Sequence, residues 1–222
     1  MALRDERDPR PRLSRERVLQ EAVVLADESG IEALSMRRLG ERLGVEAMSL
    51  YKHVANKEDL LDAMVDSVFA EIDRAEQERS WRPAMRRRSV SVRAVLKQHP
   101  WAVPMMQSRA NPGPSTLRHL DALIGILREA GFSVVLTAHA LSVIDAYVYG
   151  FAMQEKALPF DTEERSSEVV QQILAAMPAD EFPHLVEFSR EHVLKPGYDY
   201  GAEFEWGLDL VLDGLARVRR RR

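Results

Sequence analysis

A short stretch near the N-terminus gathers side chains that could bind the phosphate backbone of a nucleic acid. Tyr51 and Lys52 are adjacent, and Lys57 follows a few residues later. A phenol hydroxyl and two ammonium groups beside a short helix are suited to contact phosphate oxygens. Ser35 adds a hydroxyl at the expected start of a helix, where the local dipole also favours an anion. These residue types predict a surface that contacts phosphates.

Two short helices would position these side chains. Ser35 is typical of a helix N-cap and Gly44 of a helix end, which predicts a helix over "MRRLGERL". A second short helix is expected from Glu46 to near His53. Two such helices joined by a glycine-containing turn form a helix-turn-helix, whose second helix projects its first residues into the major groove of DNA.

Flanking helices must hold this pair, because a helix of two turns is unstable alone. Ser14 predicts the start of a preceding helix that Gly30 ends, and Asn56 predicts the start of a fourth helix running toward Glu78. Asp59 lies where a capping box places its acid. The apolar residues spaced to pack the short helices against these neighbours are Leu39, Leu43, Val45, Leu50 and Val54.

Charge alone leaves an alternative open. The net charge is −4, and residues 34–57 carry five cationic and two acidic side chains, a local balance of +3 that leaves −7 for the remainder. A basic patch on an acidic body can give phosphate contacts. A helix-turn-helix can also be a plain packing motif, with Tyr51 at the edge of the core and the cations on a solvated face.

The rest of the chain indicates an all-α protein. Helix-period patterns predict helices at 83–98, 101–108, 114–130, 133–157, 163–176, 180–194 and 201–218, with no alternating strand pattern and no repeat. The 222 residues include no cysteine, which excludes disulfides and thiolate metal sites. The charged N-terminus resembles no signal peptide, and no stretch is apolar enough to span a bilayer. We therefore expect a cytoplasmic protein without a membrane partner.

The segment "SGIEALSMRRLGERLGVEAMSLYKHVANKEDLLDAM" closely resembles the DNA-binding domain of the TetR family of bacterial repressors. The residues that match the family motif are Gly30, Leu39, Leu43, Gly44, Val45, Leu50, Tyr51, His53, Val54, Asn56, Lys57 and Leu60. Further along, "KQHPWAVPMM", "LREAGFSVVLTAHALSVIDAYVYGFAMQE" and "FEWGLDLVLDGL" look like the ligand-binding and dimerising part of the tetracycline-repressor subgroup.

This resemblance implies a ligand-responsive transcriptional regulator, usually a repressor, that binds operator DNA as a homodimer. Together with the helix pattern, it leads us to expect a flexible arm at 1–13, a three-helix helix-turn-helix domain at 14–60, a larger helical effector-binding and dimerisation domain at 61–218, and a basic tail at 219–222. We expect a palindromic operator and release by a small, largely apolar effector. The alternative is a helical dimerisation or scaffold module without a small-molecule response.

Residue by residue, the resemblance assigns base-facing positions to Arg37, Glu46, Ala47 and Met48. It assigns backbone contacts to Ser35, Ser49, Tyr51, Lys52 and Lys57. Ala47 and Met48 stand where the tetracycline repressor has Gln and Pro. An apolar pair can touch a thymine methyl group but cannot hydrogen-bond adenine, so we expect a different operator.

Met and aromatic residues on three expected helices could line an apolar pocket, although each could also be ordinary core. Asp145, a lone charge on an apolar helix, is either a paired acid or a polar anchor for a ligand. The candidate effector-binding residues are His99, Trp101, Met105, Met106, Arg109, His119, Leu120, Asp145 and Tyr149.

The effector is expected not to be a tetracycline–magnesium chelate. The drug-contacting His and Asn of the tetracycline repressor align near Asp73 and Arg88, and its metal-ligand His near Met106. A thioether is a poor ligand for magnesium. We expect a hydrophobic or amphipathic molecule and no metal or cofactor.

The homodimer is expected to pair the helices near 133–157 and 201–218 of two copies in a four-helix bundle. The apolar residues assigned to this pairing are Leu141, Ile144, Val148, Phe204, Leu208, Leu212 and Leu215. An enzyme is not expected. The six histidines lack metal-site spacing, and the chain contains no G-x-S-x-G motif and no phosphate-binding glycine loop.

Overall fold

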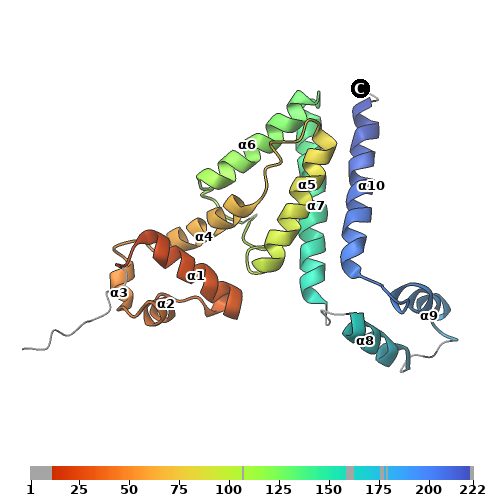
Figure 1. The fold of residues 1–222 in the computed structure, drawn as a ribbon, viewed down its shortest axis with the longest axis horizontal. Coiled ribbons are helices and arrows are strands. Elements are labelled where there is room, and N and C mark those ends of the chain that lie inside the picture. The colour runs from red at the N-terminus through yellow and green to blue at the C-terminus, as the bar shows by residue number, and fades with distance from the viewer. Residues whose placement is uncertain (1–11, 107, 159–162, 176–177, 179, 221–222) are drawn as a thin grey trace, which may run out of the picture. The chain divides into compact units, whose positions relative to one another are not determined.

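The computed structural model describes residues 12–106, 108–158, 163–175, 178 and 180–220 (Figure 1). Within these residues every regular element is helical, which confirms the all-α fold class. Most of the expected N-terminal arm and the last two residues of the basic tail lie outside the described residues, as does the expected end of the 163–176 helix.

The described residues form two compact units, and the chain visits the first unit twice. The first unit comprises the residues up to Glu71 together with Gln98–His119, and the second comprises Ile72–Lys97 and the residues from Leu120 onward. The chain therefore leaves the first unit after Glu71 and returns to it at Gln98.

In the first unit, α1 (Arg15–Ser29), the short η1 turn (Ile31–Ala33), α2 (Met36–Leu43), α3 (Ala47–Leu50) and α4 (Lys57–Glu71) follow one another. The predicted local signals are confirmed. The hydroxyl of Ser14 accepts from the N–H of Arg17, and that of Ser35 from the N–H of Arg38, both at 3.2 Å. Gly44 ends α2 in the left-handed conformation, with φ 68° and ψ 33°.

Two predicted helix boundaries and one predicted helix are wrong. The third helix is shorter than expected, because hydrogen-bonded turns replace it after Leu50. The fourth ends at Glu71 because the Asp73 carboxylate accepts from the N–H of Ala75, which adopts φ 55° in a tight turn. No helix forms over the described residues of 101–108, where Pro104 lacks an N–H and only isolated turns occur.

The second unit contains α5 (Trp81–Gln98), most of α6 (Pro114–Glu129), α7 (Val134–Ala157), α8 (Glu163–Ala175), α9 (Pro183–Phe188), a π-helical turn η2 (Ser189–Val193) and α10 (Tyr200–Arg220). The two longest helices, α7 and α10, lie side by side (Figure 1). The hydroxyl of Tyr147 donates to the carbonyl of Phe204 at 2.9 Å. Any Cβ at position 207 would lie 2.3 Å from that hydroxyl, so Gly207 permits this close approach.

The burial of residues on α7 and α10 bears on two predictions made from the sequence. By length and hydropathy alone α7 could cross a membrane, contrary to the sequence expectation, but it packs on α10 through buried residues, as core helices do. Most of the apolar residues that the sequence assigned to the dimer interface are instead buried within the chain itself. The residues buried there are Ile144, Val148, Phe204, Leu208, Leu212 and Leu215.

Candidate DNA-binding surface and effector core

The first unit fixes α3 closely against α2. A Cβ at position 40 would lie 2.8 Å from the carbonyl oxygen of Val45, so only glycine allows this approach. The N–H of Val45 donates to the carbonyl of Gly40 at 2.9 Å, and Leu39 and Leu50 are fully buried beneath the pair. The packing therefore gives the four-residue helix α3 a defined orientation that it could not hold alone.

The outer face of this pair carries the predicted DNA-contacting residues. Met48 is 72% exposed and Tyr51 is 43% exposed, both large side chains that the core leaves in solvent. The remaining predicted residues are exposed at Ser35, Arg37, Glu46, Lys52 and Lys57, and half-buried at Ala47 and Ser49. Arg37 lies 3.6 Å from Glu41 on the same helix, a solvent-exposed pair that leaves its guanidinium accessible.

An ion pair between residues far apart in the sequence connects α1 to the start of α4. Arg15 donates to both carboxylate oxygens of Asp59, at 3.0 and 2.9 Å, and to the carbonyl of His53 at 2.9 Å. The hydrogen bond to Arg15 and one from the N–H of Ala55 lower the pKa of Asp59. The expected N-cap at Asn56 accepts from the N–H of Asp59 at 2.8 Å. The sequence signalled this cap, but nothing local pointed to Arg15 as the partner.

The returning segment Gln98–His119 is bound to α4 by carboxylates spaced along that helix. Arg109 donates to Asp62 at 2.5 Å and lies 2.9 Å from Glu58. Asp66 accepts from the N–H and the hydroxyl of Thr116, at 2.8 and 3.0 Å, and so caps the start of α6. Sequence reasoning did not identify these acids as functional.

Six of the nine candidate effector-binding residues belong to the first unit. His99 contacts Asp27 and Glu71, and the indole N–H of Trp101 donates to Asp27 at 2.6 Å. His119 is fully buried, with its ring centroid 5.5 Å from that of Phe69. The other three are Arg109, bound by α4, and the half-buried Met105 and Met106.

The remaining three candidates lie in the second unit, where Leu120 is exposed and Asp145 and Tyr149 belong to a polar cluster. Arg88, 1% exposed, donates to Asp145 at 2.7 Å, so the paired-acid interpretation of Asp145 holds. Burial raises the pKa of Tyr149 to about 12, because the phenolate would lose its hydration. Sequence reasoning did not select Arg88 as a binding residue.

Among the residues that the structure describes, two buried hydroxyls of the second unit lack a hydrogen-bond partner. They belong to Ser89 on α5 and Thr137 on α7, which are 0% and 4% exposed. A buried hydroxyl without a partner costs free energy, of order 1–3 kcal/mol, unless a water or a ligand satisfies it. These two groups therefore mark positions where the apolar core can accept a polar atom.

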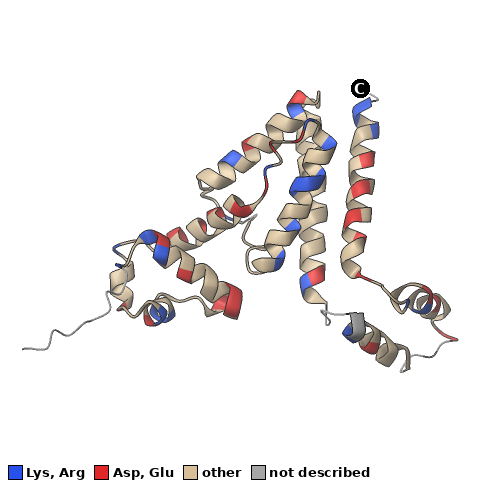
Figure 2. Ribbon diagram, viewed as in Figure 1, with Lys and Arg blue, Asp and Glu red and all other residues tan. Residues whose placement is uncertain are grey.

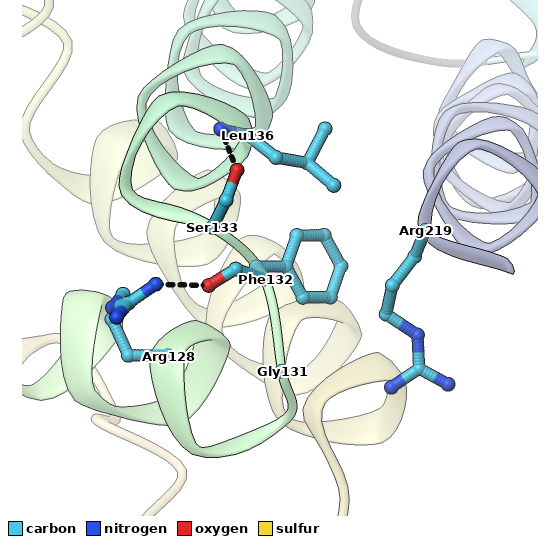
Figure 3. Close-up of a pocket in the computed structure, with 6 residues that line it drawn as sticks. All are labelled: Arg128, Gly131, Phe132, Ser133, Leu136 and Arg219. Atoms are coloured by element: carbon cyan, nitrogen blue, oxygen red, sulfur yellow. Dashed lines mark hydrogen bonds between the residues drawn. The ribbon is translucent and has the colours of Figure 1, made fainter. Parts of the chain in front are cut away.

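A separate cavity of about 370 Å³ lies where α6 passes into α7 (Figure 3). None of the candidate effector-binding residues lines it. Arg128 donates to the carbonyl of Phe132, and Arg219 donates to that of Ala130 at 2.7 Å. Both guanidinium groups thus satisfy backbone carbonyls of the connection, which indicates a structural role for this corner of the unit.

Comparison with known proteins identifies two family domains in the chain. A family model described as bacterial regulatory proteins of the tetR family matches residues 18–64, and one described as the tetracyclin repressor-like C-terminal domain matches residues 75–219. The HTH-type transcriptional repressor DrrR1 of Streptomyces coeruleorubidus is 31% identical over 96% of this chain and 80% of its own length. The class C tetracycline repressor of Escherichia coli is 30% identical over 94% of this chain and 93% of its own.

Solved structures show the same architecture. A possible TetR-family regulator from Streptomyces coelicolor A3(2), 33% identical, covers 92% of this chain and 100% of its own with a TM-score of 0.74. ActR of Streptomyces coelicolor, in complex with actinorhodin, is 27% identical and covers 94% and 100% with a TM-score of 0.76. With two family models spanning most of its length, this chain belongs to the TetR family of ligand-responsive bacterial transcriptional regulators.

Proposed function

We propose that this regulator is a homodimeric repressor that binds a palindromic operator and is released by a small, largely apolar effector. The observation that carries the proposal is the outer face of α2 and α3, where Met48 and Tyr51 stand in solvent beside exposed cations. Contacts within the chain do not explain why these large side chains are exposed. Contact with the major groove of DNA and its phosphates would explain it. The similarity to DrrR1 and to the tetracycline repressors supports repression.

Operator binding is tested with the DNA upstream of the protein's own gene, by fluorescence anisotropy at fixed salt. Arg37→Ala should weaken binding by about 1–3 kcal/mol and relax specificity at one base pair. Lys57→Ala should weaken binding to all sequences about equally. Lys195→Ala, which removes an exposed cation of the second unit, is the matched control. Unchanged operator affinity in Arg37→Ala would refute the base-reading role.

The proposed dimer uses faces of α7 and α10 that the chain itself leaves uncovered. Their large exposed apolar residues are Val134, Val135, Val143, Met153, Trp206, Leu210 and Val218. Gly150 and Gly214 lie in these helices, yet a Cβ at either position would meet no described atom of the chain within 4 Å. A glycine inside a helix costs about 1 kcal/mol relative to alanine. Close approach of a second copy would account for both glycines.

Sedimentation velocity tests the dimer. Gly214→Arg should produce a folded monomer, because the new side chain has room in the chain but not between two close helices. Gly125→Arg is the control, since that α6 glycine also has nothing within 4 Å of an added Cβ. A wild-type monomer at micromolar concentration would contradict the dimer, and the palindromic operator with it.

We place the effector's polar anchors in the second unit, at the cluster of Arg88, Asp145 and Tyr149. Ser89, next to Arg88 in the sequence, and Thr137 on α7 are also buried in this unit, with hydroxyls that lack a partner among the described residues. An amphipathic molecule with a few polar atoms suits these surroundings. A thermal-shift screen of the wild type and Asp145→Asn against metabolites should find a stabilising molecule whose effect the substitution reduces. Equal stabilisation of both proteins would remove Asp145 from the site.

A tetracycline–magnesium chelate is not the effector in this proposal. The aligned positions are occupied by Asp73, which binds Arg87 at 2.6 Å, by Arg88, which binds Asp145, and by Met106. None of the three has the side-chain chemistry of the His or Asn at the aligned position, and the thioether of Met106 is a weak ligand for magnesium. Calorimetry with tetracycline, with and without magnesium, should show no tight binding. Magnesium-dependent binding would overturn the assignment.

A further inference from the structure

His99 lies at the point where the chain returns to the first unit, and it contacts two helices. Its side chain is buried, with the residue 7% exposed. Its Nδ1 lies 2.8 Å from Oδ1 of Asp27 on α1, and its Nε2 lies 3.2 Å from Oε2 of Glu71 on α4. Trp101 donates its indole N–H to the same oxygen of Asp27. One imidazole thus bridges the helices that flank the helix-turn-helix.

This geometry depends on the charge of the imidazole. A carboxylate oxygen only accepts hydrogen bonds, and a neutral imidazole donates from only one of its two nitrogens. Both contacts can therefore be hydrogen bonds only when His99 is the doubly protonated imidazolium. After loss of a proton, one nitrogen would present a lone pair to a carboxylate oxygen. We expect the Glu71 contact to break first, because it is longer and Glu71 is the more exposed acid.

The charges around His99 favour the protonated form. Burial lowers its pKa, but the hydrogen bonds and charges of Asp27 and Glu71 outweigh burial, so its pKa lies above the ordinary value of 6.5. Asp27 from α1 and Glu71 from α4 are the charged groups facing the ring, and Trp101 faces it from the segment itself. With a raised pKa, the bridge is complete below about pH 6.5 and is lost as pH rises through the folded-state pKa.

We propose that His99 is a proton-dependent positioning residue, which ties α1 to α4 when charged and thereby raises the affinity of the protein for its operator. The inference rests on the proposed operator binding. α1 packs on α2 and on α4, and α2 in turn packs on α3. A bridge between α1 and α4 fixes the position of α1, and through α2 that of the recognition helix α3, before DNA binds. Less conformational entropy is then lost on binding DNA.

The test measures operator affinity of the full-length protein between about pH 5.5 and 8.5 at constant ionic strength. We expect the wild type to lose about tenfold in affinity on raising the pH, the change that corresponds to a coupling of one pKa unit. His99→Gln should lack this component of the profile. The control is His192→Gln, since His192 also meets a carboxylate, Glu203 at 2.9 Å, but is half-exposed and lies in the second unit. The His192→Gln protein should show the same dependence of operator affinity on pH as the wild type.

Glu71→Gln separates positioning from mere stability. A glutamine amide can donate to a neutral imidazole nitrogen through its NH₂ group, so the bridge should persist at high pH. This half-exposed position should tolerate the change, and the variant should hold its affinity across the range where the wild type loses it. Parallel profiles for wild type and His99→Gln, or an affinity that rises with pH through His99, would overturn the proposal. Absence of operator binding at every pH would instead refute the proposed function.

Discussion

Helices α4 and α10 carry the same pattern of acids and use it differently. Each presents three carboxylates at intervals of four residues, visible as regular acidic bands along α10 (Figure 2). The three are Glu58, Asp62 and Asp66 on α4, and Glu205, Asp209 and Asp213 on α10. On α4 they hold the segment Gln98–His119, including the backbone at the start of α6. On α10 they pair with the two arginine side chains Arg82 and Arg86 of α5.

Exposure separates the central ion pair of the α4 stripe from the pairs of the α10 stripe, although Glu58 is itself 69% exposed. Asp62 and Arg109 are each only 16% exposed, whereas the partners on α5 and α10 are 37–53% exposed. Water screens exposed pairs and lets them rearrange, so each contributes little to stability. A partly buried pair leaves an unsatisfied group when one member is removed. Equal spacing in a sequence therefore says little about the energy of the contacts.

Of three substitutions in the two stripes, Asp62→Asn should lower the free energy of unfolding the most. The substitution removes the charge facing Arg109 in a mostly buried site, and hydrogen bonds to charged groups contribute about 1.5–3 kcal/mol. Urea unfolding followed by circular dichroism should show a loss of that size. A loss below about 0.5 kcal/mol would mean that solvent reaches Arg109 as freely as it reaches the arginines on α5.

Asp66→Ala should have an intermediate effect. This acid caps α6 from outside the helix, by accepting from the N–H groups of Ser115 and Thr116. Loss of such a cap costs about 1 kcal/mol. Gly113→Ala should reproduce part of that loss without touching the charge, because its Cβ would lie 2.3 Å from Cγ of Asp66. A fully stable Gly113→Ala protein would show that Asp66 can move without cost.

The smallest effect is expected from Arg82→Gln on the second stripe. Arg82 contacts Asp209 and Asp213 at 3.2 and 2.8 Å, but all three side chains are well exposed. The loss should be below about 1 kcal/mol. It should nearly vanish in 1 M salt, where the screening length is about 3 Å. A salt-independent loss above 2 kcal/mol would remove the contrast between the two stripes.

Local signals made much of the first unit predictable. Ser14, Ser35, Gly44 and Asn56 define helix ends through bonds to residues within one turn, so their effect can be read directly along the chain. The segment 101–108 was wrongly predicted to be helical because its Met and Trp residues follow a helical apolar pattern, while Pro104 cannot donate a backbone hydrogen bond.

The partners of charged residues were beyond prediction. His99 and Arg109 were predicted to be polar groups near an effector, but the acids that they contact lie on α1 and α4, far away in the sequence. The same limit applies to Arg88 and Asp145, which are brought together by packing of α5 with α7. Periodicity identifies a buried face but does not indicate which charge will meet which.

The double visit of the chain to the first unit has a consequence for how the protein matures on the ribosome. Residues up to Glu71 include all of the helix-turn-helix, yet α4 and α1 meet their carboxylate-bound partners only once Gln98–His119 has been made. At about 5–20 residues per second, that segment follows on the order of 2–10 seconds later. During this delay Asp27, Asp62 and Asp66 are charged groups without their partners. A nascent chain stalled after Glu71 should therefore display the recognition helix on an incompletely supported scaffold, and acquire full protease resistance only when the segment emerges.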